Sequence, residues 1–225
     1  MTGLALVVAA LAVAAGDWVA VARGSKPAEY VLKPLVMLLL IVAAIELRHG
    51  DPAGRCALTA AALLLSLAGD VFLMLPQDLF VAGLAAFLLA HLAYIGAFDS
   101  PRITGVSLAA VVAVVLGVVL VGAPIALRIR LALIRSGKAA LAGAVQVYVV
   151  AISIMVVFAL LTAFRPDWSA GRSALAIAGA LLFFSSDGMI GWSRFVSDFP
   201  GSRVAIIVTY HLGQIGLLLG LLGTK

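Results

Sequence analysis

The chain has 225 residues, of which 64% are hydrophobic and only 11% are charged, and its mean hydropathy is +1.23. This composition excludes a soluble globular domain and is typical of an integral membrane protein. The formal net charge of +5 comes from residues near the ends of apolar runs. It favours contact with anionic membrane lipids and gives no support to a nucleic-acid partner.

Eight apolar runs are long enough to cross a bilayer, since a spanning helix needs about 20 residues. Lipid offers no hydrogen-bond partners to an open backbone, so runs of this length without alternation are expected to be helices. The predicted spans are residues 2–22, 30–47, 56–75, 79–98, 104–122, 139–164, 171–191 and 203–222. The expected fold class is all-α, a single polytopic transmembrane helical bundle over residues 1–225.

Basic residues give a prediction of topology. The loops after the first, third, fifth and seventh spans lie on one side, called here the odd-loop face, and this side holds nine Lys and Arg residues against six on the other. This bias predicts that the odd-loop face is cytoplasmic. The densest basic stretch, Arg128 to Lys138, is expected in the loop between the fifth and sixth spans. Arg165 and Asp167 are expected to be solvated at the end of a span.

Two aspartates lie inside predicted spans, Asp70 in residues 56–75 and Asp187 in residues 171–191. A carboxylate in a spanning helix costs about 2.5–3.5 kcal/mol on insertion scales and usually marks a functional site. Each lies ~10 Å from the odd-loop end of its helix. Asp17 is also on this side, but its neighbour Trp18 favours an interfacial position.

Further polar side chains from other spans reach the same half of the membrane. These side chains are Lys33, His91, Tyr148, Tyr210 and Gln214. Because scattered polar residues would not be expected to share one side so consistently, the sequence predicts a polar site in the odd-loop half.

A short sequence match suggests an internal duplication. The segment His91-Leu92-Ala93-Tyr94-Ile95-Gly96 resembles His211-Leu212-Gly213-Gln214-Ile215-Gly216 at an offset of 120 residues. Asp70 and Asp187 are 117 residues apart. Two parallel four-helix repeats, residues 1–100 and 101–225, would bring the aspartates to equivalent places around a central cavity.

Different short motifs are present in six of the eight predicted spans. They are Lys33-Pro34, Gly69-Asp70, Met74-Leu75, Gly83, Phe87, His91, Tyr94, Tyr148, Ser186-Asp187, Tyr210 and Gln214. In this order, and over nearly the whole chain, they resemble the pattern of the YhhN family, which includes the animal lysoplasmalogenases. The resemblance implies hydrolysis of the vinyl-ether bond of 1-alkenyl lysophospholipids to a fatty aldehyde and a glycerophospho-alcohol.

Apart from the family resemblance, the residues themselves suit this reaction. An enol ether is cleaved when an acid protonates its β-carbon and water captures the oxocarbenium ion. Two carboxyls in an apolar site can divide these tasks, so our hypothesis is that one of Asp70 and Asp187 is the general acid and the other stabilises the cation. Lys33 would hold the lipid phosphate or pair with an aspartate. The remaining side chains would orient the carboxylates or the glycerol: His91, Tyr94, Tyr148, Ser186, Tyr210 and Gln214.

Other functions remain open at this point. A proton-coupled transporter would also use membrane carboxylates, although it would favour broken helices, and the only proline expected inside a span is Pro34, near an end. A lipid-binding protein, or an ion pair that merely fixes helix packing, could carry the same residues. No cluster with metal-ligand spacing is present in the sequence, so neither a metal nor another cofactor is expected. The sequence does not determine the oligomeric state.

Overall fold

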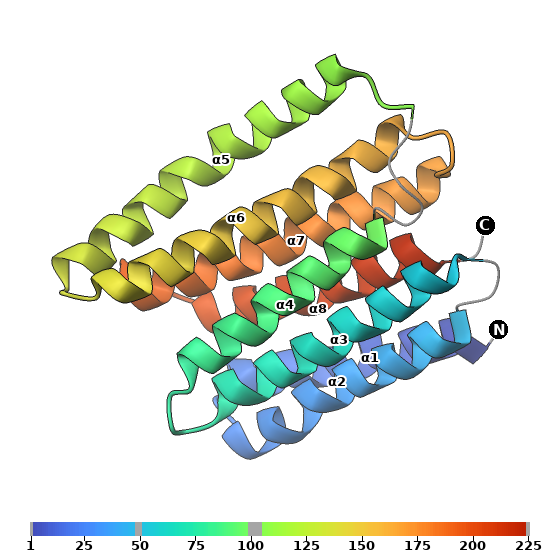
Figure 1. Cartoon of the computed structure of the whole chain (residues 1–225). Helices are drawn as coiled ribbons and strands as arrows, with labels where there is room; N and C mark the ends of the chain where they lie inside the picture. Colours follow the sequence, from blue (N-terminus) through green and yellow to red (C-terminus); the bar gives the residue numbers. More distant parts are fainter. Residues whose placement is uncertain (1, 48–50, 99–104, 224–225) are drawn as a thin grey trace.

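The computed structural model describes residues 2–47, 51–98 and 105–223, which fold as a bundle of α-helices (Figure 1). The helices are α1 (Thr2–Ala22), α2 (Lys26–Leu47), α3 (Ala53–Met74), α4 (Phe80–Phe98), α5 (Leu108–Arg135), α6 (Ala139–Leu161), α7 (Ala170–Phe195) and α8 (Ser202–Leu222). A short 3-10 turn, η1 (Thr162–Phe164), continues α6. All eight helices are long and apolar enough to span a membrane, which confirms the predicted fold class and a multi-pass membrane protein.

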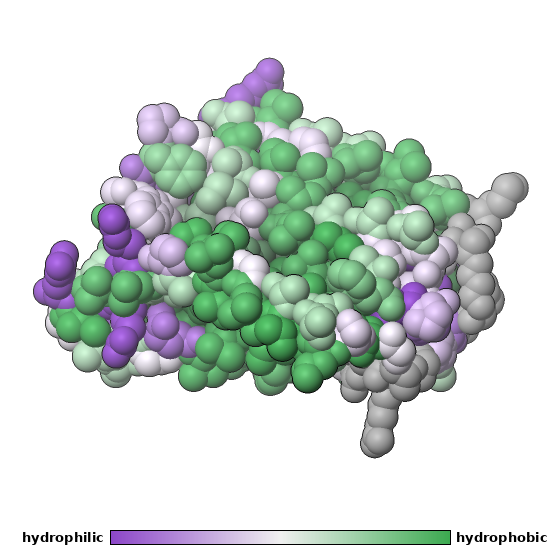
Figure 2. All heavy atoms as spheres, turned by 90° about the horizontal axis from the view of Figure 1, so that it is seen from above, coloured by the Kyte–Doolittle hydropathy of each residue, from purple (hydrophilic) through white to green (hydrophobic). Residues whose placement is uncertain are grey.

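Consecutive helices pack against each other except α4 and α5, since α4 packs against α6 instead, and α8 also contacts α1, α2 and α3. Helix α5 lies along one edge of the bundle and α1 and α2 lie along the opposite edge (Figure 1). The space-filling view shows hydrophobic atoms across the middle of the molecule and hydrophilic atoms gathered toward its ends (Figure 2). A protein surface of this kind matches a bilayer core with a polar interface on each side.

Glycines allow α7 and α8 to pack in close backbone contact. A Cβ on Gly216 would lie 2.8 Å from the Cα of Gly179, and a Cβ on Gly213 would lie 2.9 Å from the backbone nitrogen of Phe183. Small residues permit this approach between membrane helices, where packing rather than the hydrophobic effect drives association. The two helices therefore form a rigid pair that carries Asp187 and Tyr210.

The prediction for the fifth span was too short. Helix α5 runs to Arg135, so Arg128, Arg130 and Arg135 are exposed on its last turns rather than in a loop. The physical reason is amphipathicity: Ile129 and Leu133 are buried one turn apart while the arginines face outward. Helix α5 also contains Pro124, which corrects the expectation that no span has a proline in its interior, yet α5 continues through it without a break.

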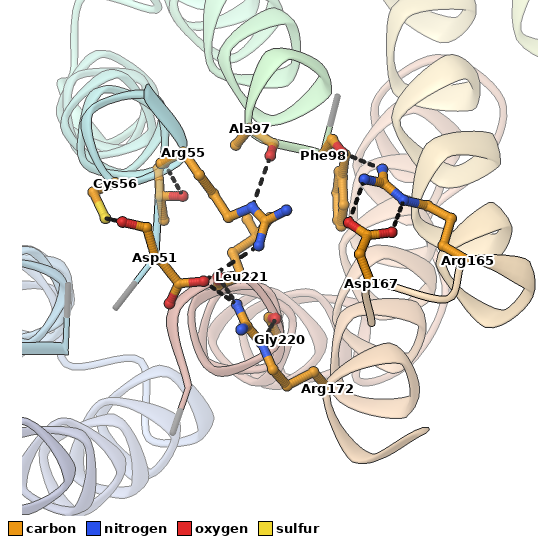
Figure 3. Close-up of polar contacts among 11 residues, drawn as sticks. Asp51, Arg55, Cys56, Ala97, Phe98, Arg165, Asp167, Arg172, Gly220 and Leu221 are labelled. Atoms are coloured by element: carbon orange, nitrogen blue, oxygen red, sulfur yellow. Dashed lines mark hydrogen bonds and ion pairs between the residues drawn. The ribbon is translucent and has the colours of Figure 1, made fainter. Parts of the chain in front are cut away.

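The face opposite the odd-loop face holds a buried arginine cluster, shown in Figure 3. Arg55 and Arg172 both bind Oδ1 of Asp51, at 3.2 and 2.9 Å. Arg165 forms an ion pair with Asp167 and donates a hydrogen bond of 2.6 Å to the carbonyl oxygen of Phe98. Arg165 is therefore buried rather than solvated, which corrects the prediction for this residue.

Trp168 lies at the centre of this cluster, because the guanidinium groups of Arg55, Arg165 and Arg172 lie 4.9, 5.8 and 5.4 Å from its ring centroid. The arginines also bind carbonyl oxygens at the C-terminal ends of α4 and α8, which lack intrahelical partners. The cluster thus fixes the helix ends at this face. Arg48, Arg102 and Lys225, counted in the topology prediction, lie outside the described residues, as does residue 104 of the fifth predicted span.

Candidate active site

Asp70 is buried and held by two helices distant from it in sequence. Nζ of Lys33 on α2 lies 2.9 Å from Oδ1, and the hydroxyl of Tyr210 on α8 donates to Oδ2 at 2.5 Å. The Tyr210 hydroxyl also lies 3.5 Å from Sδ of Met37, one turn beyond Lys33 on α2. The carboxylate of Asp70 is therefore compensated by a cation and a hydroxyl donor, as a charge in a membrane interior requires.

Asp187 has a different set of partners. The hydroxyl of Tyr148 on α6 donates to Oδ2, and Nε2 of His91 on α4 lies 3.7 Å from the same oxygen. The side chain of Asp187 keeps 10% of its surface exposed, against 1% for Asp70. The two carboxylates predicted as a pair thus lie in separate, unequal surroundings.

Aromatic rings lie near both aspartate clusters. The ring of Phe183 lies 5.5 Å from Tyr210 and 4.9 Å from His91, while Phe87 lies 5.9 Å from Tyr210. Phe183 therefore contacts one partner of each aspartate, Tyr210 beside Asp70 and His91 beside Asp187.

Two further predicted residues form a hydrogen bond beside this site. Tyr94 donates to Oε1 of Gln214 at 2.6 Å, and both side chains are fully buried. Ser186 instead donates to the backbone oxygen of Ile206 at 3.1 Å, a bond between α7 and α8. The structure thus brings Tyr94 and Gln214 to the Asp70 cluster and engages Ser186 in helix packing.

An apolar cavity of about 640 Å³ lies between α4, α5, α6 and α7. Among the described residues that line it, Asp187 is the one carboxylate, and Tyr148 lies beside it. The lining on α5 extends from Val114 to Ile129, a distance of about 22 Å along the helix. Its length and apolar lining suit a single hydrocarbon chain, and Asp187 forms part of its wall.

Sequence reasoning missed Asp17. It was expected at the interface, but it is fully buried. The neighbouring Trp18 donates to Nδ1 of His211 at 3.2 Å. A signal was present in the sequence, because Asp17 continues a stripe of buried small or apolar residues on α1 that includes Ala10 and Ala14.

The described side chains do not gather into a set of metal ligands. Over residues 2–47, 51–98 and 105–223, no three His, Cys, Asp or Glu side chains gather as a metal site requires.

Comparison with known proteins gives a consistent family. A Mycobacterium tuberculosis protein named lysoplasmalogenase is 37% identical over 161 residues, which cover 71% of this chain and 58% of that protein. The mouse and human proteins named lysoplasmalogenase TMEM86B are 30% and 31% identical, over 73% and 75% of this chain and 63% and 65% of their own lengths. The matched region therefore spans less than two thirds of each of these relatives. No solved structure matches the chain.

The match to the family itself covers more of this chain than any of these three alignments. It extends over residues 28–221 and so includes Lys33, both intramembrane aspartates, Tyr210 and Gln214. The resemblance found in the sequence motifs is confirmed, and the chain belongs to the YhhN family.

Proposed function

We propose that this protein is a membrane-embedded lysoplasmalogenase, an enzyme that hydrolyses the vinyl-ether bond of 1-alkenyl lysophospholipids. The names of its relatives support this substrate class. The observation that carries the proposal is the position of Asp187, a carboxyl group hydrogen-bonded by Tyr148 in the wall of an apolar cavity. A single-chain lipid whose alkenyl chain occupied this cavity would bring its vinyl-ether bond to an acid.

In this proposal, protonated Asp187 donates its proton to the β-carbon of the vinyl ether, and the double-bond electrons form the new C–H bond. The α-carbon becomes an oxocarbenium ion, which water attacks to give a hemiacetal. Collapse of the hemiacetal breaks the bond to the glycerol oxygen and releases the fatty aldehyde and the glycerophospho-alcohol. The proton lost by water returns to the carboxylate, so the reaction consumes one water and the acid is regenerated.

Asp70 has a supporting role in this scheme. It does not line the cavity, but it forms an ion pair with Lys33. Its negative charge offsets that of Lys33, so the lysine does not oppose formation of the cationic intermediate. Lys33 is engaged by Asp70, which supports its role as a partner of the aspartate over a role in phosphate binding.

The lipid phosphate would lie at the odd-loop end of the cavity. Arg128 and Arg130 are exposed on either side of Ile129, which lines the cavity at that end. Guanidinium groups at this position suit a phosphate at the membrane surface. We keep the prediction that this face is cytoplasmic, which labelling of an exposed single-cysteine variant in a Cys56→Ser background would test from each side of the membrane.

The decisive experiment gives the purified protein 1-alkenyl lysophosphatidylethanolamine or its 1-alkyl analogue and measures aldehyde release. We expect aldehyde from the alkenyl lipid alone, and at least about 10²-fold slower release by Asp187→Asn. Asp70→Asn should also be slower, since Lys33 is then left as an uncompensated positive charge near the cationic intermediate. Full activity in Asp187→Asn would overturn the assignment of the acid. Proton flux in liposomes, without aldehyde release, would instead identify a proton-coupled transporter.

A further inference from the structure

Beside Asp70, on the side away from the apolar cavity, two buried side chains from different helices carry polar atoms that have no hydrogen-bond partner among the described residues. Asp17 on α1 and His211 on α8 are both fully buried. Three of their atoms have no hydrogen-bond partner over the described residues: both carboxylate oxygens of Asp17 and Nε2 of His211. A buried carboxylate without a partner costs several kcal/mol, so its presence calls for a ligand that satisfies it.

The geometry of Trp18 defines what this ligand must offer. Because the indole N–H of Trp18 donates to Nδ1 of His211, a neutral His211 carries its hydrogen on Nε2 and is a donor there. Asp17 supplies acceptors. A ligand between them must therefore both donate and accept hydrogen bonds, which water does.

Charged groups connect this place with the odd-loop face. His211 lies 5.5 Å, ring to ring, from Tyr210, which donates to Asp70, the partner of Lys33. Glu29 and Arg203 form an ion pair of 2.6 Å between α2 and α8, with the Arg203 side chain half-exposed. Glu29 precedes Lys33 by one turn on α2, so this pair lies ~6 Å closer to the membrane surface than Lys33 does.

Further buried polar side chains lie near the cavity. Gln214 lies one turn beyond Tyr210 on α8 and His91 lies on α4, and both are fully buried. His91 in turn lies 3.7 Å from the carboxylate of Asp187. The series thus extends from the odd-loop face to the group that we assign as the acid.

We propose that Asp17, Lys33 and His211 enclose a hydrated chamber between α1, α2, α3 and α8, which supplies the water consumed in hydrolysis and relays protons to the acid. The relay function rests on the proposed hydrolase activity, whereas the hydration of the chamber does not. An apolar cavity filled by a lipid chain excludes water, so the hydrolytic water must reach the bond from the polar side. Asp17 is the relay residue at the outer end of this path.

Hydration can be measured without catalysis, by hydroxyl-radical footprinting of the protein in lipid nanodiscs. Radicals formed from internal water oxidise adjacent methionines. Met37 contacts the Tyr210 hydroxyl beside the chamber, and Met155 on α6 is an equally buried control. We expect several-fold faster oxidation of Met37 than of Met155, and loss of this difference in Asp17→Leu. Equal, slow oxidation of both methionines in the wild-type protein would overturn the chamber.

The relay function has its own test in the rate of aldehyde release. We expect Asp17→Asn to lower kcat by about 10²-fold with KM for the alkenyl lipid unchanged, and Asp17→Glu or added formate to restore part of the rate. A purely structural residue would not respond to formate. Wild-type kcat in Asp17→Asn would overturn the relay. Fast Met37 oxidation without any aldehyde release by the wild-type protein would support the chamber and reject the hydrolase function instead.

Discussion

The hydroxyl of Tyr94 donates a 2.6 Å hydrogen bond to Oε1 of Gln214, and these two residues hold the same position in the two matching segments of α4 and α8. Residues at equivalent positions contact each other when they lie near a two-fold axis. The bond therefore supports the proposal of two parallel four-helix repeats, with the axis close to this pair.

The partners of the two aspartates follow the same symmetry. Asp70 is bound by Lys33 from the second helix of its own half and by Tyr210 from the fourth helix of the other half. Asp187 is bound by Tyr148 from the second helix of its half and approached by His91 from the fourth helix of the other half. Equivalent scaffolds carry different residues, so one carboxylate is ion-paired and the other is left to face the cavity.

Removal of Lys33 should reveal the cost of an uncompensated Asp70. We expect Lys33→Leu to lower the free energy of unfolding by about 3–5 kcal/mol, because it leaves a buried carboxylate without its cation. The double variant Lys33→Leu with Asp70→Leu should regain most of this loss. Urea unfolding in detergent micelles measures both, and equal stability of the single and double variants would contradict the ion pair.

The length of the cavity predicts chain-length selectivity. Gly117 lines the cavity on α5 and has open space where a side chain would project, so Gly117→Trp should fill part of it. We expect KM to rise for long-chain alkenyl lysolipids and to change little for short-chain ones. Leu116→Trp is the matched control, since Leu116 is exposed on the outer surface of the same helix. An equal effect of both variants would show that the chain binds elsewhere.

The close approach of α7 and α8 predicts that alanine substitutions at two glycines differ sharply in their effect on stability. Gly216→Ala would place its methyl group against the backbone of Gly179, and we expect a loss of about 1–3 kcal/mol. Gly143→Ala on α6 meets no atom within 4 Å and should be neutral or stabilising, by up to about 1 kcal/mol. Thermal unfolding distinguishes the two, and tolerance of Gly216→Ala would show that the helices can separate at little cost.

Asp167 gives a prediction for acid stability at the membrane surface. A hydrogen bond from Arg165 lowers the pKa of Asp167 from its usual 3.8. Because the folded-state pKa is below the unfolded one, the stabilisation is present above pH 3.8 and is lost as pH falls through the lowered pKa. Asp167→Asn should therefore be less stable at neutral pH, by less than about 1 kcal/mol for a carboxyl group so exposed to solvent. The difference between the two proteins should vanish in strong acid, and a difference that persists there would contradict this origin.

The sequence by itself determined the eight helices and the half of the membrane in which the polar residues lie. Hydrophobic length dictates a spanning helix, because an open backbone has no partners in lipid. Depth along a helix follows from residue number, so Asp70, Asp187 and Tyr210 could be placed at a common level before any contact was known. The end of α5 was missed because the predicted span stopped at residue 122, before Pro124, whereas the helix continues through this proline to Arg135.

Only the tertiary structure decided how these residues face one another. Residue number fixes height in the membrane but not the rotation of one helix against another, and rotation is set by packing such as the contact between Gly179 and Gly216. That packing aims Asp187 into the apolar cavity and turns Asp70 toward Lys33. It also buries Asp17, because α1 packs against α8 at the level where an isolated helix would have exposed this carboxylate to the interface.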